Sequence, residues 1–243
     1  MDEKGLGVAG RRKRSWKFWL AMPLMLVAAL IAIPLVLVPL YWVVPPVSTL
    51  MVSRYVTGQP VTRVWRDIDE ISDRLKTAVV LSEDGQFCSH HGVDVAALRA
   101  EIDNFLAGQE ARGASTITMQ VARNLFLWNG RSVVRKVLEV PLAIYIDLVL
   151  PKRRIMEIYL NIAEWGPDGQ FGVEAGAQAA FGTSAENFTW QRAALLTVTL
   201  PNPHVRRPGH PTAGLTSVAG IVEARARRFS SNASCLFNGP PAL

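Results

Sequence analysis

Residues 112–124 read RGASTITMQVARN and form the most informative stretch of this chain. A glycine-containing turn comes first, and Ser115 or Thr116 can then cap a helix by accepting a hydrogen bond from one of its first backbone N–H groups. Three polar side chains at spacing i, i+3 and i+4 share one face of that helix: Gln120, Arg123 and Asn124. The stretch therefore predicts a short helix that presents donors suited to phosphate groups.

A second informative stretch, residues 83–92, reads EDGQFCSHHG. Four apolar residues precede it at helical spacing: Ile68, Ile71, Leu75 and Val79. They predict a helix from about residue 67 to residue 85, which places Glu83 and Asp84 at its C-terminal end. The negative pole of the helix dipole lies there and raises the affinity of an acid for a proton. This property suits a general base.

The rest of the chain after residue 66 also reads as helical. Asp94 is placed to cap a second helix. Further helices are expected near residues 132–150, 153–162, 173–181, 189–200 and 212–229. Pro141 interrupts the first of these and should kink it, because proline lacks the N–H that the helix needs. Since no repeat and no strand-rich region is found, the sequence predicts a mainly α fold.

The net charge of +6 is concentrated at the N-terminus. Residues 1–17 contain six basic and two acidic residues, so this tail alone has a charge of +4. The remaining residues are close to neutral and predict no basic face of the kind that binds nucleic acid. The basic tail instead suggests a membrane surface as the anionic partner.

Residues 18–44 contain no charged side chain. As a helix they would span about 40 Å, which exceeds the roughly 30 Å hydrocarbon core of a bilayer. The alternative is a cleaved signal peptide, but its apolar region would be shorter, and residues 20–40 contain no Ala-x-Ala site. The sequence thus predicts a cytoplasmic tail (1–17), a transmembrane anchor (18–44), a linker (45–66) and an exported domain (67–243), oriented by the positive-inside rule.

Cys88 and Cys235 would then lie in an oxidising compartment. They can form a disulfide that closes a loop of roughly 147 residues, which would restrict the unfolded chain strongly. The alternative of two unpaired thiols stays open at the level of sequence.

A second carboxylate, Glu139, follows Arg135 at spacing i, i+4 and has Lys136 beside it. Taken alone, this is the pattern of an ordinary salt bridge on a solvated helix. A glycosidase needs a strong general acid because a sugar hydroxyl is a poor leaving group. A glycosyl pyrophosphate leaves readily once cations neutralise it, so its enzyme needs one good base and a basic cluster. Glu83 and the downstream basic residues fit this second chemistry: Arg123, Arg135, Lys136, Lys152 and Arg153.

Two other classes of site are not supported. His90 and His91 are adjacent and lack a partner at metal-ligand spacing, so no histidine metal site is predicted. No lysine has a serine three residues before it, and no Lys-Thr-Gly occurs. The motifs of a penicillin-sensitive transpeptidase are therefore missing.

Five blocks of residues occur in order between residues 75 and 203. They are Glu83-Asp84, Phe87, His90 and Gly92; Gly113, Ser115–Thr118, Gln120 and Asn124; Arg135-Lys136 and Glu139; Lys152, Ile155, Glu157 and Tyr159-Leu160-Asn161; and Phe181-Gly182, Ala193–Leu196 and Pro201-Asn202-Pro203. Together they resemble the signature of the peptidoglycan glycosyltransferases, and the short chain on one anchor looks like a monofunctional biosynthetic transglycosylase. Arg123 departs from the pattern, because lysine is usual there, and it offers a fork of donors in place of a point charge.

The resemblance implies a lysozyme-like, mainly α glycosyltransferase domain preceded by one transmembrane helix. It also implies that the enzyme polymerises lipid II into linear β-1,4 glycan and releases undecaprenyl pyrophosphate. Glu83 would be the catalytic base and Glu139 the second essential carboxylate. A divalent cation such as Mg²⁺ would help to hold the pyrophosphate. The implied substrate-binding residues are Asp84, Phe87, His90, Ser115, Thr116, Gln120, Arg123, Asn124, Arg135, Lys136, Lys152 and Asn161.

The implied partners are lipid II, the growing glycan strand, the membrane and other cell-wall synthesis or division proteins. The implied location is the bacterial inner membrane, with the catalytic domain in the periplasm. Two alternatives stay open: a lysozyme-like hydrolase or lytic transglycosylase on the same fold, and a non-catalytic scaffold. The basic cluster and the Ser-Thr-Ile-Thr block argue against the first, and the presence of both Glu83 and Glu139 argues against the second.

Overall fold

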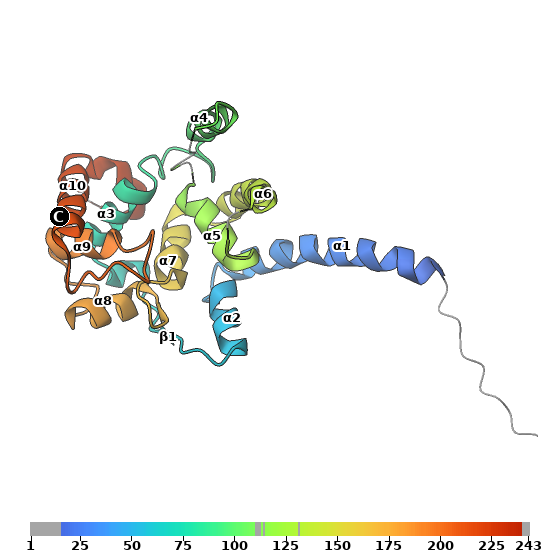
Figure 1. Ribbon diagram of the computed structural model, residues 1–243, viewed down its shortest axis with the longest axis horizontal. Coiled ribbons are helices and arrows are strands. Elements are labelled where there is room, and N and C mark those ends of the chain that lie inside the picture. Colours follow the sequence, from blue (N-terminus) through green and yellow to red (C-terminus); the bar gives the residue numbers. More distant parts are fainter. Residues whose placement is uncertain (1–15, 110–112, 114, 131, 240–243) are drawn as a thin grey trace, which may run out of the picture. The chain divides into compact units, whose positions relative to one another are not determined.

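The computed structural model describes residues 16–109, 113, 115–130 and 132–239, shown in Figure 1. The chain divides into two units, residues 1–37 and 38–243. Helix α1 (Trp16–Leu40) makes up the described part of the first unit and ends just inside the second. Its segment Ala21–Leu40 is long and apolar enough to cross a membrane. Most of the predicted basic tail lies outside the described residues.

The second unit is mainly helical, as the sequence predicts. Its elements are α2 (Thr49–Val56), β1 (Thr62–Arg63), the 3-10 helix η1 (Ile68–Glu70), α3 (Asp73–Glu83), α4 (Val95–Leu106), α5 (Ile117–Phe126), α6 (Val133–Val149), α7 (Lys152–Ile162), β2 (Gln170–Phe171), α8 (Val173–Phe181), α9 (Trp190–Thr197), α10 (Ala213–Arg228) and the 3-10 helix η2 (Ser230–Leu236). The two short strands pair in parallel.

Helix α3 forms the centre of this unit. Its residues from Leu75 to Leu81 are all buried, including the polar Lys76 and Thr77. It packs against α9, α10 and η2, and Figure 1 shows these helices side by side. A helix that is buried around its whole circumference is held firmly in place, because it cannot shift without displacing the closely packed side chains of its neighbours. The end of α3 is therefore a rigid support for Glu83, its last residue.

The predicted helix over residues 67–85 is wrong in its first part. Residues Ile68–Glu70 form a separate 3-10 turn, which a capping box between Asp67 and Glu70 closes. Ile71 is extended (φ −107°, ψ 133°), so the chain leaves the helical path before α3 begins. Periodic apolar residues on both sides of this break concealed it from the sequence pattern.

The segment predicted as a linker with one short strand-like stretch, residues 45–66, contains the strand β1 and also the helix α2, which the sequence did not predict. Ser48 caps α2 by accepting a hydrogen bond from the Met51 backbone, and Met51 is fully buried. The Thr49 hydroxyl donates to the carbonyl of Leu127 at the end of α5 (2.8 Å). The segment thus belongs to the folded domain. Helix α1 ends at Leu40, four residues before the predicted end of the anchor.

Helices α5, α6 and α7 lie next to one another and form the other side of the domain (Figure 1). Thr116 caps α5 by accepting from the Met119 backbone at 3.1 Å, as one of the two residues expected there. Asp94 caps α4 through the backbone of Ala97, also as predicted. Helix α6 runs through Pro141 without ending.

Cys88 and Cys235 form a disulfide, which settles the alternative that the sequence left open. The bond joins the loop after Glu83 to η2, near the end of the described chain. Beside it, the side chain of Asn232 donates to the carbonyl of Gly85 (2.9 Å). The last turns of the chain therefore fasten the loop that follows α3.

Removing this cross-link should destabilise the fold. We expect Cys88→Ala/Cys235→Ala to lower the free energy of unfolding by about 2–5 kcal/mol, because the unfolded chain gains the freedom that a link across 147 residues denies it. Urea unfolding with and without a reductant measures the effect. Reduction should destabilise the wild type and leave the double variant unchanged, whereas a wild type indifferent to reductant would contradict the expectation.

Gly92 joins the same loop to α6 at very short range. It has φ +79°, and a Cβ there would lie 2.4 Å from the carbonyl oxygen of Ala143. Gly58 has a similar φ of +70° but no heavy atom within 4 Å of its Cβ position. Gly92→Ala should therefore cost about 1–3 kcal/mol more stability than the matched Gly58→Ala. Equal losses in urea unfolding would show that α6 moves aside freely.

Candidate active site

Glu83 lies at the C-terminal end of α3 in a partly buried position. One carboxylate oxygen, Oε2, accepts a hydrogen bond from the side-chain amide of Gln120 in α5 (3.1 Å). The other, Oε1, has only a long contact of 3.5 Å with the hydroxyl of Ser82. One oxygen is thus held firmly, while the second stays available to a substrate.

The pKa of the Glu83 carboxyl is raised above its ordinary value. Burial is the main cause, because it disfavours the charged form. The hydrogen bonds from Gln120 and Ser82 oppose the shift, and so do the positive charges of Arg123 and Arg206. The environment of Glu83 thus raises its affinity for a proton, as the sequence predicted, although burial has replaced the helix dipole as the first cause.

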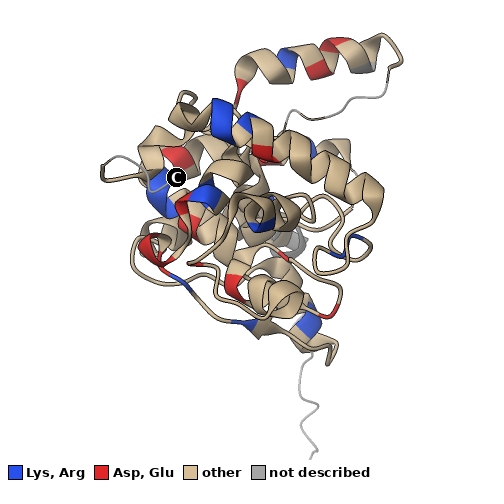
Figure 2. Cartoon of the chain, turned by 90° about the vertical axis from the view of Figure 1, so that its left-hand side faces the viewer, with Lys and Arg blue, Asp and Glu red and all other residues tan. Residues whose placement is uncertain are grey.

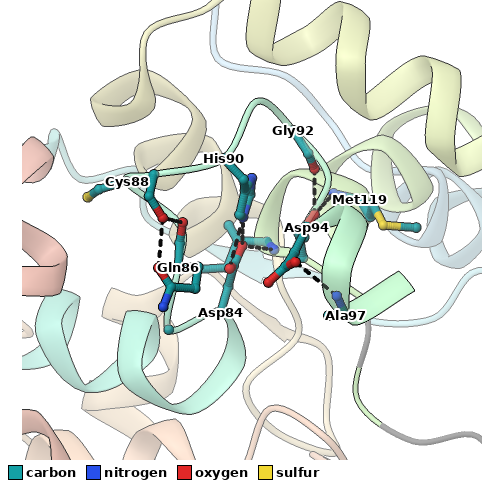
Figure 3. A network of polar contacts seen from close by, with 12 residues as sticks. Asp84, Gln86, Cys88, His90, Gly92, Asp94, Ala97 and Met119 are labelled. Carbon is teal, nitrogen blue, oxygen red and sulfur yellow. Dashed lines mark hydrogen bonds and ion pairs between the residues drawn. The ribbon is translucent and has the colours of Figure 1, made fainter. Parts of the chain in front are cut away.

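The loop after Glu83 is organised by Asp84, as Figure 3 shows. Its carboxylate contacts the Nε2 atom of His90 (2.9 and 3.0 Å) and accepts from the backbone N–H of Ile117 at the start of α5 (3.0 Å). The hydroxyl of Thr116 donates to the carbonyl of Gly92 at 2.6 Å. These bonds fix the loop against the N-terminus of α5.

Lys152, at the start of α7, supports the same loop from another side. Its ammonium group donates to the carbonyl of His90 (2.7 Å) and lies 4.7 Å from the ring centre of Phe87. It also pairs with Asp147 at 2.5 Å. Because its ammonium group has these three partners at once, Lys152 has little freedom to move. Its contacts support the loop.

Glu139, the second carboxylate, is 2% exposed and pairs with Arg135 one turn earlier on α6. Burial raises the pKa of Glu139, while the positive charges of Arg135, Lys136 and Arg123 oppose the shift. Arg123 therefore acts electrostatically on both Glu83 and Glu139. Arg123 of α5 is thus the side chain that links the surroundings of the two carboxylates.

Lys136 of α6 contacts the loop before α5, whereas Arg135 contacts the carbonyl of Gly130 in the loop before α6. The ammonium group of Lys136 donates to the hydroxyl of Ser115 (2.5 Å) and lies 3.9 Å from Glu101 of α4. Burial lowers the pKa of Lys136. Across the helices in Figure 2, basic and acidic segments are interspersed. Positive charge available to an anion is therefore concentrated locally, at Arg123, Arg135 and Lys136, and not spread over a broad basic face.

Two hollows adjoin Gln120 and Glu83. A cleft of about 200 Å³ is lined by Glu83, Asp84, Ser115, Thr116 and Arg225, among others. A second cleft of about 240 Å³ is lined by residues of α5 and α7 and of the loop after α9, including Gln120, Arg123 and Asn124. The predicted site residues of α3, α5 and the loop before α5 therefore border space that a substrate can enter.

Several residues predicted to touch substrate have internal contacts instead. Asn161 is 0% exposed, and its amide bonds to the backbone N–H and carbonyl of Arg66 (both 2.8 Å). Phe87 is also fully buried, and Thr116 is occupied as the cap of α5. Asn161 and Phe87 therefore have no exposed surface in this structure, and their contacts hold neighbouring segments in place.

Two basic residues of the site were not found from the sequence. Arg206, in the loop after α9, lowers the pKa of Glu83 by its charge and donates to the carbonyl of Val198 at 2.6 Å. Arg225 of α10 lines the cleft that contains Glu83. Neither lies at a spacing that signals a site, since only the packing of α9 and α10 against α3 brings them near.

The described residues contain no group of three or more His, Cys, Asp or Glu side chains that could hold a metal ion. Glu139 is engaged by Arg135, and Asp84 by His90 and the backbone of Ile117. These donors therefore do not fit a resident metal ion by themselves.

Comparison with known proteins gives a consistent result. The model of a family described as Transglycosylase matches residues 50–227. A biosynthetic peptidoglycan transglycosylase of Rhodopseudomonas palustris is 56% identical over 199 residues, which cover 82% of this chain and 84% of that protein. Proteins with the same description from Mesorhizobium japonicum and Brucella suis are 50% identical over 230 and 223 residues, covering 93% and 91% of this chain and 97% and 99% of theirs. The chain belongs to the transglycosylase family.

Proposed function

We propose that this protein polymerises lipid II into linear glycan strands of peptidoglycan, with Glu83 as the base of an inverting glycosyl transfer. The observation that supports this most is the arrangement around Glu83. Its carboxylate is held on one oxygen by Gln120, faces a cleft, and lies within the electrostatic reach of Arg123 and Arg206. The family membership and the names of the relatives agree with this activity.

In the proposed reaction the 4-hydroxyl oxygen of the acceptor GlcNAc attacks C1 of the MurNAc at the lipid end of the growing strand. Glu83 takes the hydroxyl proton through Oε1, the oxygen that has only the long contact with Ser82. The bond from C1 to the pyrophosphate oxygen breaks, and its electron pair leaves with undecaprenyl pyrophosphate. Attack opposite the leaving group gives the β-1,4 bond.

The leaving pyrophosphate needs positive charge around it. We assign this role to Arg123, Arg135 and Lys136, with Ser115 as a further donor beside Lys136. Glu139 pairs with Arg135 and so directs its guanidinium group. A divalent cation stays part of the proposal as a companion of the pyrophosphate, since the oxygen atoms of that group are the hard ligands Mg²⁺ prefers.

A hydrolytic activity is less well supported. A glycosidase would need a carboxylic acid that stays protonated to assist a poor leaving group. The raised pKa of Glu83 would by itself also suit such an acid. The positive charges of Arg123, Arg135 and Lys136 distinguish the two chemistries, because a pyrophosphate leaving group needs them and a glycosidase does not.

The apolar helix α1 and the described relatives support a membrane-anchored protein. We propose that the N-terminal tail faces the cytoplasm and the catalytic domain the periplasm, as the basic residues before α1 indicate. A disulfide in the domain agrees with an oxidising compartment. Lipid II would then present its sugars to the domain while its tail remains in the bilayer. Other cell-wall synthesis or division proteins stay candidate partners.

The direct test is polymerisation of labelled lipid II by purified protein. Glu83→Gln should lower the rate by about 10²–10⁴-fold, because an amide cannot accept the acceptor's proton. Glu186→Gln, which changes an exposed carboxylate elsewhere, is the matched control and should retain full activity. Polymer made at wild-type rate by Glu83→Gln would contradict the proposal, and cleavage of finished glycan without polymerisation would favour the hydrolase.

The raised pKa of Glu83 has two consequences for pH dependence. The base must be ionised, so activity should fall on acidification with a midpoint above about 4.3, the ordinary value for glutamate. The folded state binds this proton more tightly than the unfolded chain, so stability falls as pH rises between the two values. Glu83→Gln should therefore melt at a higher temperature than wild type at neutral pH, and the difference should vanish below pH of about 4. Equal melting temperatures at neutral pH would show that burying the ionised carboxylate of Glu83 does not destabilise the fold.

A further inference from the structure

Three side chains from three different helices form a continuous hydrogen-bonded chain that ends at Glu83. The hydroxyl of Tyr159 in α7 lies 3.1 Å from Oε1 of Gln120 in α5. The Nε2 atom of the same amide lies 3.1 Å from Oε2 of Glu83 in α3. Helix α7 thus has a polar contact with the end of α3 through α5.

The direction of the hydrogen bonds in this chain follows from the chemistry of its first member. Tyr159 is 1% exposed, and burial raises its pKa well above the ordinary value, so its hydroxyl stays protonated. It can donate to the carbonyl oxygen of Gln120. A half-turn of the amide would place that oxygen against the carboxylate of Glu83, where two acceptors repel each other. The carboxylate of Glu83 and the hydroxyl of Tyr159 therefore favour the same orientation, in which the NH₂ group faces Glu83.

We propose that Tyr159 is a positioning residue for Glu83, acting through the amide of Gln120. This positioning role rests on the proposed function, in which Glu83 is the base. By fixing the amide, Tyr159 keeps Oε2 of Glu83 occupied and directs Oε1 to the acceptor hydroxyl. Tyr159 is 1% exposed and borders the cleft beside Gln120, and we assign it no contact with the reacting atoms.

This assigns Gln120 a place that the sequence did not predict. The resemblance implied contact between Gln120 and substrate, and the structure adds that its amide bridges Tyr159 and Glu83 within the protein. The motif blocks that contain Gln120 and Tyr159 therefore meet at the side chain of Gln120. Together, the two residues support Glu83 from α5 and α7.

Other groups also act on Glu83 and remain in place when Tyr159 is changed. Arg123 from α5 and Arg206 from the loop after α9 favour its ionised form, and Asp84 follows it in the chain. Arg225 of α10 lines its cleft. Since Tyr159→Phe keeps the ring and removes only the hydroxyl, it separates the hydrogen bond from these charges.

The experiment measures kcat, KM and pH dependence for lipid II polymerisation by the full chain. We expect Tyr159→Phe to lower kcat by about threefold to tenfold, the worth of one hydrogen bond, with little change in KM. The acidic limb of kcat should move to higher pH, because the ionised base loses a fixed donor. Tyr41→Phe, at another buried tyrosine, is the matched control and should leave the profile unchanged.

A double variant shows whether Tyr159 acts through Gln120. In the background of Gln120→Leu, Tyr159→Phe should add no further loss, since the relay is already broken. Additive losses, or a wild-type pH profile for Tyr159→Phe, would overturn the proposal. Glu83→Gln measured alongside distinguishes the two levels of inference. If Glu83→Gln is inactive and Tyr159→Phe is normal, only the relay fails, and if Glu83→Gln polymerises, both proposals fail.

Discussion

The burial of α3 on all sides is the constraint on which the rest of the domain depends. The helix is enclosed by α9, α10 and η2, so its direction and its end point are fixed by the core. Glu83 is the last residue of this helix and emerges where the enclosure stops. Surrounding donors and cations offset only part of the cost of burying a carboxylate there, so the pKa of Glu83 stays raised. A stable core and a base with a raised pKa thus follow from the same packing.

The site is assembled from segments that approach α3 from separate directions. Helix α5 contributes Gln120 and Arg123, and α6 contributes Glu139 with its cations. The loop after Glu83 is tied to α5 by Asp84 and to η2 by the disulfide (Figure 3). Because each tie joins a different pair of elements, the loop has little freedom to move independently of the base.

The residues of the motif blocks divide into two groups by what they contact. Some border the clefts and carry the proposed chemistry, and they include Glu83, Ser115 and Arg123. Others are buried and hold the first group in place, as Asn161 does through the backbone of Arg66. Thr116 does both, since it caps α5 and borders the cleft of Glu83. Residues of both kinds stand in the same ordered blocks, so the pattern alone does not separate chemistry from support.

The sequence by itself determined the apolar anchor, the mainly helical domain, the caps at Asp94 and Thr116, and the two carboxylates with their basic neighbours. These features depend on local spacing, and the family blocks between residues 75 and 203 made the activity class recognisable. Only the tertiary structure decided the pairing of Cys88 with Cys235, the place of α2 in the domain, and the approach of Arg206 and Tyr159 to the site of Glu83. Those contacts join residues far apart in the chain. They arise because α3 must be buried, and no spacing along the sequence records which neighbours bury it.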